Sequence, residues 1–365
     1  MAVRMVLNTP LCDRLGISVP IFLAGMGRPA GPELAAAVSN AGGLGVIGAT
    51  RCEPAEIRER IKRTRELTDK PFGVDLILPA KVSRERQTVA ELQAMIPQSH
   101  RRFVDELRVR FNLADDRQAV LDSRALGTDT KAQLEVILEE KPPVFVSGLG
   151  NPGFMIPDAH SQDMIVMAVV GSVRSATEVA AAGVDVVIAQ GAEGGGHTGT
   201  VGTFVLLPQV IDSVAPVPVL AAGGIADGRG VAAALVLGCA GVWVGTRFLA
   251  SKEAEWPEWK KDSIVAADER STKITRSYTG KPIRSITNEW IDAWEQADIR
   301  PLPMPLQSAL VAPLLAEADS DPRVSSNPAG QGAALVKEKL PAAEIVSRLV
   351  NEAQEAISPL IAGQQ

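Results

Sequence analysis

The sequence predicts an α/β fold, a (β/α)8 or TIM barrel, because short β-branched runs alternate along it with helical patterns. Composition agrees: Ala, Val and Gly dominate, whereas the 365 residues include one Tyr and eight Phe, a bias typical of helices packed tightly on a parallel sheet. Eight strands alternating with helices favour a closed barrel over an open doubly wound sheet. The expected strands are Val19–Ala24, Gly45–Ile47, Phe72–Leu78, Val144–Ser147, Ile165–Val170, Val186–Ala189, Val219–Ala222 and Gly241–Val244.

Helical patterns separate these strands, and most of them begin at, or directly after, Pro, Ser, Thr or Asp, which are favoured at helix N-termini. The longest apolar stretch, Val231–Val244, is shorter than the ~20 residues of a membrane span and is interrupted by glycine, so it predicts a helix followed by a buried strand. The expected helices are Pro32–Asn40, Pro54–Leu67, Thr130–Glu139, Ala176–Ala182, Phe204–Ser213 and Gly228–Leu237.

Two segments interrupt the alternation. Residues 79–141, approximately, form a charged insertion after the third strand and are expected to add helices on the barrel rim. Residues 251–340 are polar, hold four of the five tryptophans, and are expected to pack over one end of the barrel as a smaller lid or substrate segment. The barrel itself should then comprise residues 1–250 and 341–365, closed by a terminal helix.

Charge and cysteine content exclude several function classes. The net charge of −6, without a run of basic residues, argues against a nucleic-acid or anionic-membrane partner. Three widely spaced cysteines suggest neither a disulfide framework nor a zinc site, and no cluster of carboxylates and histidines has metal-ligand spacing, so no metal is expected. The first residues lack the apolar core of a signal peptide, and a reducing cytoplasm is the expected location.

Glycine loops follow the seventh and eighth expected strands, where TIM barrels typically hold phosphate. Gly223 and Gly224 precede a helix N-terminus, which favours anions, and Gly245 and Thr246 offer a backbone donor and a hydroxyl. Glycine suits this task because a Cβ would keep the backbone away from a phosphate oxygen. Such loops can also be simple strand-to-helix turns, but their presence at both strand ends favours a phosphate site.

The segment QGAEGGGHTG follows the sixth strand. Gln190 can hydrogen-bond to a flat heteroaromatic ring, and the glycines from Gly194 to Gly196 allow close backbone approach. His197 would then stand at the barrel mouth, able to accept a proton or to stabilise an anion. The alternative is a solvent-exposed histidine in a glycine linker, which its position after a barrel strand disfavours. His100 and His160, in the insertion and in a loop, are expected at the surface.

Other signatures are weak. GLGNPG, from Gly148, matches G-x-G-x-x-G, but it contains Asn-Pro and no acidic residue ends the next strand, so it predicts an irregular loop at the barrel mouth rather than a Rossmann site. The chain has no G-x-S-x-G and no Cys with a His nearby in sequence. An organic cofactor with a phosphate tail is therefore the expected reactive centre.

Taken together, these motifs resemble the nitronate monooxygenase (2-nitropropane dioxygenase) family of FMN-dependent TIM barrels. The resemblance runs from PIFLAGMG through VDVVIAQGAEGGGHTG to PVLAAGGIADGRGVAAALVLGCAGVWVGTRFLAS, and SYTGKP extends it weakly. It implies FMN as cofactor and His197 as the catalytic residue acting on a nitroalkane or its nitronate. It also implies that FMN lies against Ala24, Gly25, Met26, Gln190, Gly194 and Gly195, with its phosphate on Gly223, Gly224, Val244, Gly245 and Thr246.

Two features depart from the family pattern. Asp75 ends a GVD motif where the family more often has Asn, and a carboxylate there would bind FMN differently and disfavour an electron-rich flavin. The fifth strand lacks the Lys of related quinone reductases, which makes that activity less favoured. The GVDLILP and EGGGHTG variants also resemble a branch that includes flavoproteins of steroid-ring and acyl-CoA metabolism.

The resemblance thus implies oxidation of alkyl nitronates by O2 to a carbonyl compound and nitrite. The alternative is an FMN-dependent NAD(P)H reductase acting on an enoyl thioester or acyl-CoA. A non-catalytic FMN or phosphate-ligand binder and a flavin-free barrel isomerase are the further alternatives. Expected partners are a small-molecule substrate and O2, with NAD(P)H in the reductase case, and the sequence leaves a homodimer open.

Overall fold

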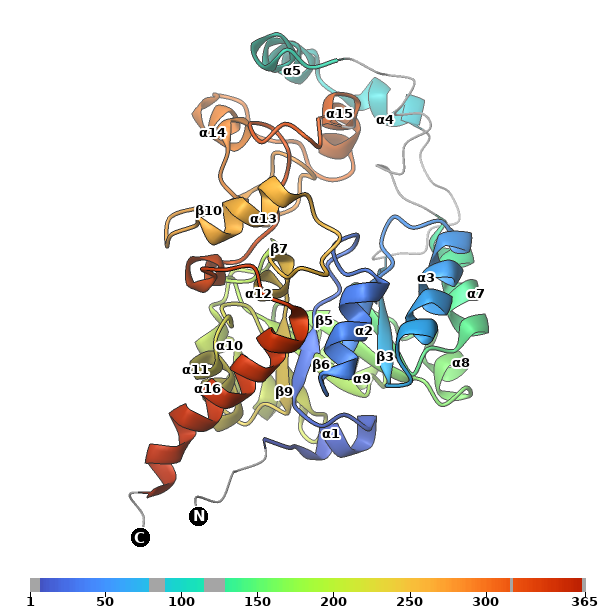
Figure 1. The fold of residues 1–365 in the computed structure, drawn as a ribbon. Helices are drawn as coiled ribbons and strands as arrows, with labels where there is room; N and C mark the ends of the chain where they lie inside the picture. The colour runs from blue at the N-terminus through green and yellow to red at the C-terminus, as the bar shows by residue number, and fades with distance from the viewer. Residues whose placement is uncertain (1–6, 79–88, 115–128, 316–317, 363–365) are drawn as a thin grey trace.

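The computed structural model describes residues 7–78, 89–114, 129–315 and 318–362, and it confirms the TIM barrel (Figure 1). Adjacent strands are parallel, in the order β1-β9-β8-β6-β5-β4-β3-β2. Backbone hydrogen bonds of 2.9 Å, from Leu23 N to Leu44 O and from Leu44 N to Ile21 O, bring the first strand against the second and close the ring. The strands are β1 (Ile21–Leu23), β2 (Gly45–Gly48), β3 (Phe72–Ile77), β4 (Val144–Leu149), β5 (Ile165–Val170), β6 (Val186–Gln190), β8 (Val219–Ala222) and β9 (Gly241–Val244).

The observed strands follow the predicted ones closely, and the largest difference is at the first. The sequence pattern predicts Val19–Ala24, whereas β1 begins at Ile21, because Pro20 has no N–H to give to a strand ladder. GLGNPG leaves β4 through Gly150, which has a φ of +93°, and enters an irregular turn in which Asn151 Oδ1 accepts from Gly153 N at 2.9 Å. The predicted irregular loop is therefore present.

Helices cover the outside of the barrel at the predicted places. They are α2 (Pro32–Asn40), α3 (Pro54–Leu67), α7 (Thr130–Glu140), α9 (Val173–Ala181), α10 (Thr203–Val214) and α11 (Gly228–Val236), with short additions at α1 (Pro10–Leu15), α8 (Ile156–His160) and α12 (Thr246–Leu249). Helix α9 starts three residues before the predicted Ala176, because Ser172 caps it by accepting from Ser175 N at 3.2 Å. The final helix, α16 (Ala342–Ala362), returns to pack on α11 and α2.

The barrel interior is apolar in its middle and more open at the C-terminal ends of the strands. Side chains alternate in and out along each strand, so large residues such as Phe22, Met167 and Trp243 fill the interior. At the mouth the inward positions are small or polar: Gly48, Asp75, Gly148, Gln190 and Gly245. The interior therefore changes from bulky apolar side chains to small or polar residues at the mouth.

A smaller unit stands above the mouth, away from both chain termini (Figure 1). Its core combines part of the insertion with part of the C-terminal segment, and Phe111, Trp290 and Trp294 are among its buried members. The elements are α4 (Val89–Met95) and α5 (Gln98–Phe111) from the insertion, and α14 (Glu289–Gln296) and α15 (Leu306–Leu315) from the later segment. Residues 79–88 and 115–128 of the insertion lie outside the described residues, and α7, at its end, lies on barrel helix α3.

Several elements join this unit to the barrel: α13 (Glu258–Val265), β10 (Thr272–Thr275), β11 (Ile283–Ile286) and the 3₁₀ helix η2 (Gln331–Leu335). Among the described helices, none is both long enough and apolar enough to span a membrane. Cys12, Cys52 and Cys239 are all buried.

Candidate active site

The loop that follows β1 lies across the barrel mouth. Its backbone passes so close to β2 and β3 that a Cβ on Gly25 would lie 2.2 Å from Asp75 Cβ, and one on Gly48 would lie 2.3 Å from Gly27 O. Ala24 N donates to Val244 O at 2.9 Å, and a Cβ on Gly245 would be 3.4 Å from Met26 Sδ. The structure thus places the predicted site residues at the ends of β1 and β9 next to each other.

Asp75 is buried beneath this loop, with 3% of its surface exposed. Its carboxyl lies between two glycines, since a Cβ on Gly148 would also approach Asp75 Oδ2 to 2.7 Å. Within the described residues neither carboxyl oxygen has a hydrogen-bond partner. Burial alone raises the pKa of the Asp75 carboxyl well above its usual range.

His197 lies on a short strand and not in a free loop. Gly196–His197 forms β7, which pairs antiparallel with β11, placing His197 opposite Ile283. Gln190 Nε2 donates to His197 O at 2.7 Å from the barrel side, and Arg284 Nε donates to Ala192 O at 3.0 Å from the other. The glycine-linker alternative therefore fails, because the histidine backbone is held from two sides.

Groups from two other loops act on the His197 side chain. Its Nε2 lies 3.4 Å from Thr279 Oγ1. Burial, and after it the positive charges of Lys281 and Arg51, together lower the pKa of His197 from 6.5 to about 4. The imidazole is thus neutral at neutral pH, in a positive field that favours an anionic ligand beside it.

The other two histidines have no part in this site. His100 Nε2 donates to Arg300 O at 3.0 Å in the smaller unit. His160 is exposed, as predicted, and lies 2.9 Å from Asp185 beside the N-terminal end of β6.

Glycines from the loops after β6 and β8 lie against each other. Gly223 and Gly224 have φ values of +92° and +74°, which L side chains rarely adopt, and a Cβ on Gly223 would be 3.0 Å from Gly194 N. The N–H groups of Gly195, Gly224 and Gly245 have no hydrogen-bond partner in the described part of the chain. These three donors are suited to an anion such as a phosphate.

The helix after β8 differs from its expected role. The sequence predicts that its free N–H groups would attract phosphate, but α11 begins at Gly228, and Glu352 Oε2 accepts from Gly228 N at 2.8 Å. Asp227 Oδ1 accepts from Gly230 N at 3.2 Å. Two carboxylates already satisfy this helix terminus, so a phosphate would depend on the glycine loop alone.

A segment that the sequence analysis did not single out completes the site. Residues 328–332, here called the strap, cross the glycine loops: Gly330 N donates to Thr246 Oγ1 and Gln331 N donates to Glu193 O, both at 2.9 Å. A Cβ on Gly195 would lie 2.7 Å from Gly330 N. The Thr246 hydroxyl is therefore an acceptor for the strap and keeps its own hydrogen for a further partner. The feature of the sequence that could have indicated the strap is the glycine spacing in PAGQG, residues 328–332.

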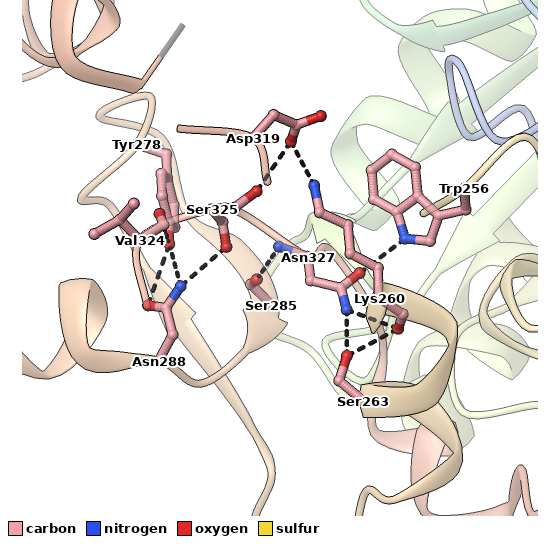
Figure 2. A network of polar contacts seen from close by, with 10 residues as sticks. All are labelled: Trp256, Lys260, Ser263, Tyr278, Ser285, Asn288, Asp319, Val324, Ser325 and Asn327. Atoms are coloured by element: carbon pink, nitrogen blue, oxygen red, sulfur yellow. Dashed lines mark hydrogen bonds and ion pairs between the residues drawn. The ribbon is translucent and has the colours of Figure 1, made fainter. Parts of the chain in front are cut away.

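Asn327 holds the strap in place, as Figure 2 shows. Its side chain accepts from Trp256 Nε1 at 3.0 Å and donates to Lys260 O at 3.1 Å and to Ser263 Oγ at 2.7 Å. Its backbone N–H donates to Ser285 Oγ at 3.1 Å. Lys260 is itself buried, pairs with Asp319 at 2.6 Å, and stacks on Trp256 with its Nζ 4.3 Å from a ring centroid.

Comparison with known proteins decides the family. The family model described as nitronate monooxygenase matches residues 8–352. The chain belongs to the nitronate monooxygenase family. As a member it is an oxidoreductase and a flavoprotein, and the resemblance predicted from its motifs is confirmed.

Relatives of this nitronate monooxygenase family member match over nearly their whole length. "Putative monooxygenase Rv1533" of Mycobacterium tuberculosis is 42% identical over 344 residues, 91% of this chain and 88% of the relative. "Probable nitronate monooxygenase" of Staphylococcus aureus is 32% identical over 357 residues, 94% of this chain and 96% of the relative.

Solved structures agree with the fold. The nitroalkane oxidase of Streptomyces ansochromogenes superposes with a TM-score of 0.82 at 32% identity, covering 96% of this chain and 99% of that one. FabK from Thermotoga maritima superposes with a TM-score of 0.78 at 35% identity, covering 98% and 99%. Within the described residues no group of three or more His, Cys, Asp or Glu has the arrangement of a metal site.

Proposed function

We propose that this protein binds FMN at the barrel mouth and oxidises alkyl nitronates with O2 to a carbonyl compound and nitrite. The observation that carries the proposal is a neutral histidine in a positive field, His197 beside Lys281 and Arg51, next to a glycine cradle. A nitronate is an anion, so this field favours its binding. The family and the nitroalkane oxidase likeness support the same reaction class.

The residues present fit FMN. The unpartnered N–H groups of Gly195, Gly224 and Gly245, with the Thr246 hydroxyl, would hold its phosphate. Ala24, Gly25 and Met26 would lie against its flat ring, and Gln190 keeps its Oε1 for it after donating to His197 O. Asp75, Gly194, Gly223 and Val244 shape the same walls. When bound, FMN supplies the redox-active ring that the protein side chains lack.

His197 would bind and orient the nitronate. A neutral imidazole has one N–H to donate to an anionic oxygen and one lone pair that can accept a proton. Thr279 Oγ1, at 3.4 Å from Nε2, fixes the ring orientation. Lys281 and Arg51 would neutralise substrate charge, and a bound anion would in turn raise the pKa of His197 toward its usual range.

We further propose that residues 251–340 act as the lid and substrate segment. Thr279 and Lys281, which face His197, both come from it, and β11 carries the pairing with β7. Substrate recognition would then depend on this segment, while FMN binding would depend mainly on the barrel loops. The cytoplasm and a homodimer remain predictions of the sequence.

The alternative function is an NAD(P)H-dependent reductase of an enoyl thioester or acyl-CoA. The likeness to FabK, with 35% identity against 32% for the nitroalkane oxidase, gives this alternative weight. The two functions differ in what reduces the flavin.

Anaerobic mixing of the purified holoprotein with NADH, NADPH or a small nitronate separates them. We expect the nitronate to bleach the flavin absorbance near ~450 nm and the nicotinamides to have little effect. His197→Ala should slow the bleaching strongly, whereas His160→Ala, a matched change near the opposite end of the barrel, should leave it unchanged. Rapid bleaching by NADH or NADPH alone would favour the reductase, and a colourless protein would refute both.

A further inference from the structure

Asp75 is a buried carboxyl group with no hydrogen-bond partner among the described residues. It faces the barrel interior at the mouth, opposite Gly48 on β2 and Val146 on β4 in the strand register. Buried polar groups almost always have hydrogen-bond partners, yet within the described residues this carboxyl has none. An unpartnered buried carboxyl at a ligand site indicates that the ligand supplies the partner.

The two glycines beside Asp75 make space for it and contribute no charge. Gly25 and Gly148 lie so close that a Cβ on either would collide with the carboxyl. Neither these residues nor those opposite Asp75 on β2 and β4 can titrate, and no charged side chain of the described residues acts on its pKa. Within the described residues nothing nearby compensates a negative charge, and a buried uncompensated carboxylate is strongly disfavoured.

The hydrogen-bonding groups of the flavin ring determine whether a carboxylic acid or a carboxylate can hydrogen-bond to it. The polar edge of the ring offers several acceptors, its carbonyl oxygens and ring nitrogens, and one N–H donor. A neutral carboxylic acid can donate to any of these acceptors. A carboxylate can only accept, and it would face mostly lone pairs.

We propose that Asp75 is a neutral carboxylic acid that donates a hydrogen bond to the bound flavin and thereby positions the ring in the barrel mouth. The inference rests on the proposed FMN site. It makes Asp75 a determinant of flavin affinity whose protonated form is the one that binds. As pH rises past the point where Asp75 ionises in the flavin-free protein, FMN affinity should fall by about tenfold per pH unit.

Three variants of the full-length protein test this. Asp75→Asn has the same shape, keeps a donor and cannot ionise, whereas Asp75→Leu keeps the branching and loses the donor. Asp158→Asn is the control, an exposed acid in α8. FMN dissociation constants would be measured by quenching of flavin fluorescence from about pH 5 to pH 9, with the folded state of each apoprotein checked by its thermal midpoint. Titration of the FMN phosphate is common to all variants, so it cancels in the comparison.

The expected result is that Asp75→Asn binds FMN within about threefold of wild type near pH 6, whereas Asp75→Leu binds at least tenfold more weakly, a loss of about 1.4 kcal/mol or more. The infrared carbonyl band of a protonated carboxylic acid should be present in the wild-type holoprotein at pH 7 and absent from Asp75→Asn. Where wild-type affinity falls with rising pH, Asp75→Asn should lose only the part that titration of the FMN phosphate contributes to every variant.

Absence of the infrared band would overturn the inference. So would equal losses of affinity in Asp75→Asn and Asp75→Leu with both apoproteins folded, because a carboxylate would then be the binding form. If wild-type protein binds no FMN at any pH, it is the proposed function that fails, and the two failures are therefore distinguishable.

Discussion

Replacing Asn327 by Ala removes the side chain that anchors the strap. Asn327 is 2% exposed and makes three side-chain hydrogen bonds. Each buried bond contributes roughly 0.5–1.5 kcal/mol net. Ser263 Oγ and Lys260 O keep their mutual bond of 2.8 Å, so only the Trp256 indole N–H loses its partner outright. The expected destabilisation is therefore about 2–4 kcal/mol.

Urea unfolding followed by tryptophan fluorescence measures this change as a lower midpoint. Asn351→Ala is the matched control, because Asn351 is exposed on α16 and makes one bond of 3.4 Å, to Ser347; its effect should stay within about 0.5 kcal/mol. FMN should also dissociate faster from Asn327→Ala, since the strap loses its anchor. A midpoint equal to that of Asn351→Ala would refute the assignment of Asn327 as the anchor.

Three further predictions follow from the same geometry. Since the pKa of His197 is lowered from 6.5 to about 4, kcat/KM for a nitronate should lose activity only as pH falls toward about 4; an inflection near 6.5 that His197→Ala abolishes would contradict this. Gly330→Ala would place a Cβ 2.5 Å from Glu193 O. The affinity for FMN, measured by ultrafiltration, should therefore drop at least tenfold (~1.4 kcal/mol). Unchanged affinity would refute a role of the strap in FMN binding. Gly45→Ala would place a Cβ 1.8 Å from Ala35 O, so the thermal midpoint should fall by an amount equivalent to about 1–3 kcal/mol or more; an unchanged midpoint would show that α2 can move away from β2.

The barrel could be predicted from the sequence because its signals are local. Each strand is a short β-branched run bounded by turn residues, and each helix has its own start signal, so the eight repeats can be counted without knowing any tertiary contact. The observed elements differ from the predicted ones at their boundaries, where a single residue can determine the first position of a strand, as Pro20 does before β1.

The parts that sequence reasoning missed depend on contacts between distant segments. Strand β7 is two residues long and exists only because Ile283 and Arg284 pair with it. The strap depends on Gly330 reaching Thr246, and the satisfied terminus of α11 depends on Glu352. No periodicity links residues so far apart, and α4 and α5 likewise find their core against α14 and α15.

The candidate site residues were placed by motif and resemblance, and the structure brings them to one end of the barrel. Asp75 was singled out as a departure from the family pattern. Its lack of a hydrogen-bond partner in the part of the chain that the structure describes, and the two glycines that make room for it, became evident only from the packing.

The position of the strap in the chain has a consequence for biosynthesis. A ribosome has made every barrel strand once Val244 has been added, yet Gly330 and Glu352 are still to come. A nascent chain at that stage has the glycine loops without the segment that closes them. Cofactor loading should thus be one of the last events in maturation, and chains released early should fold in part but leave the ribosome without flavin.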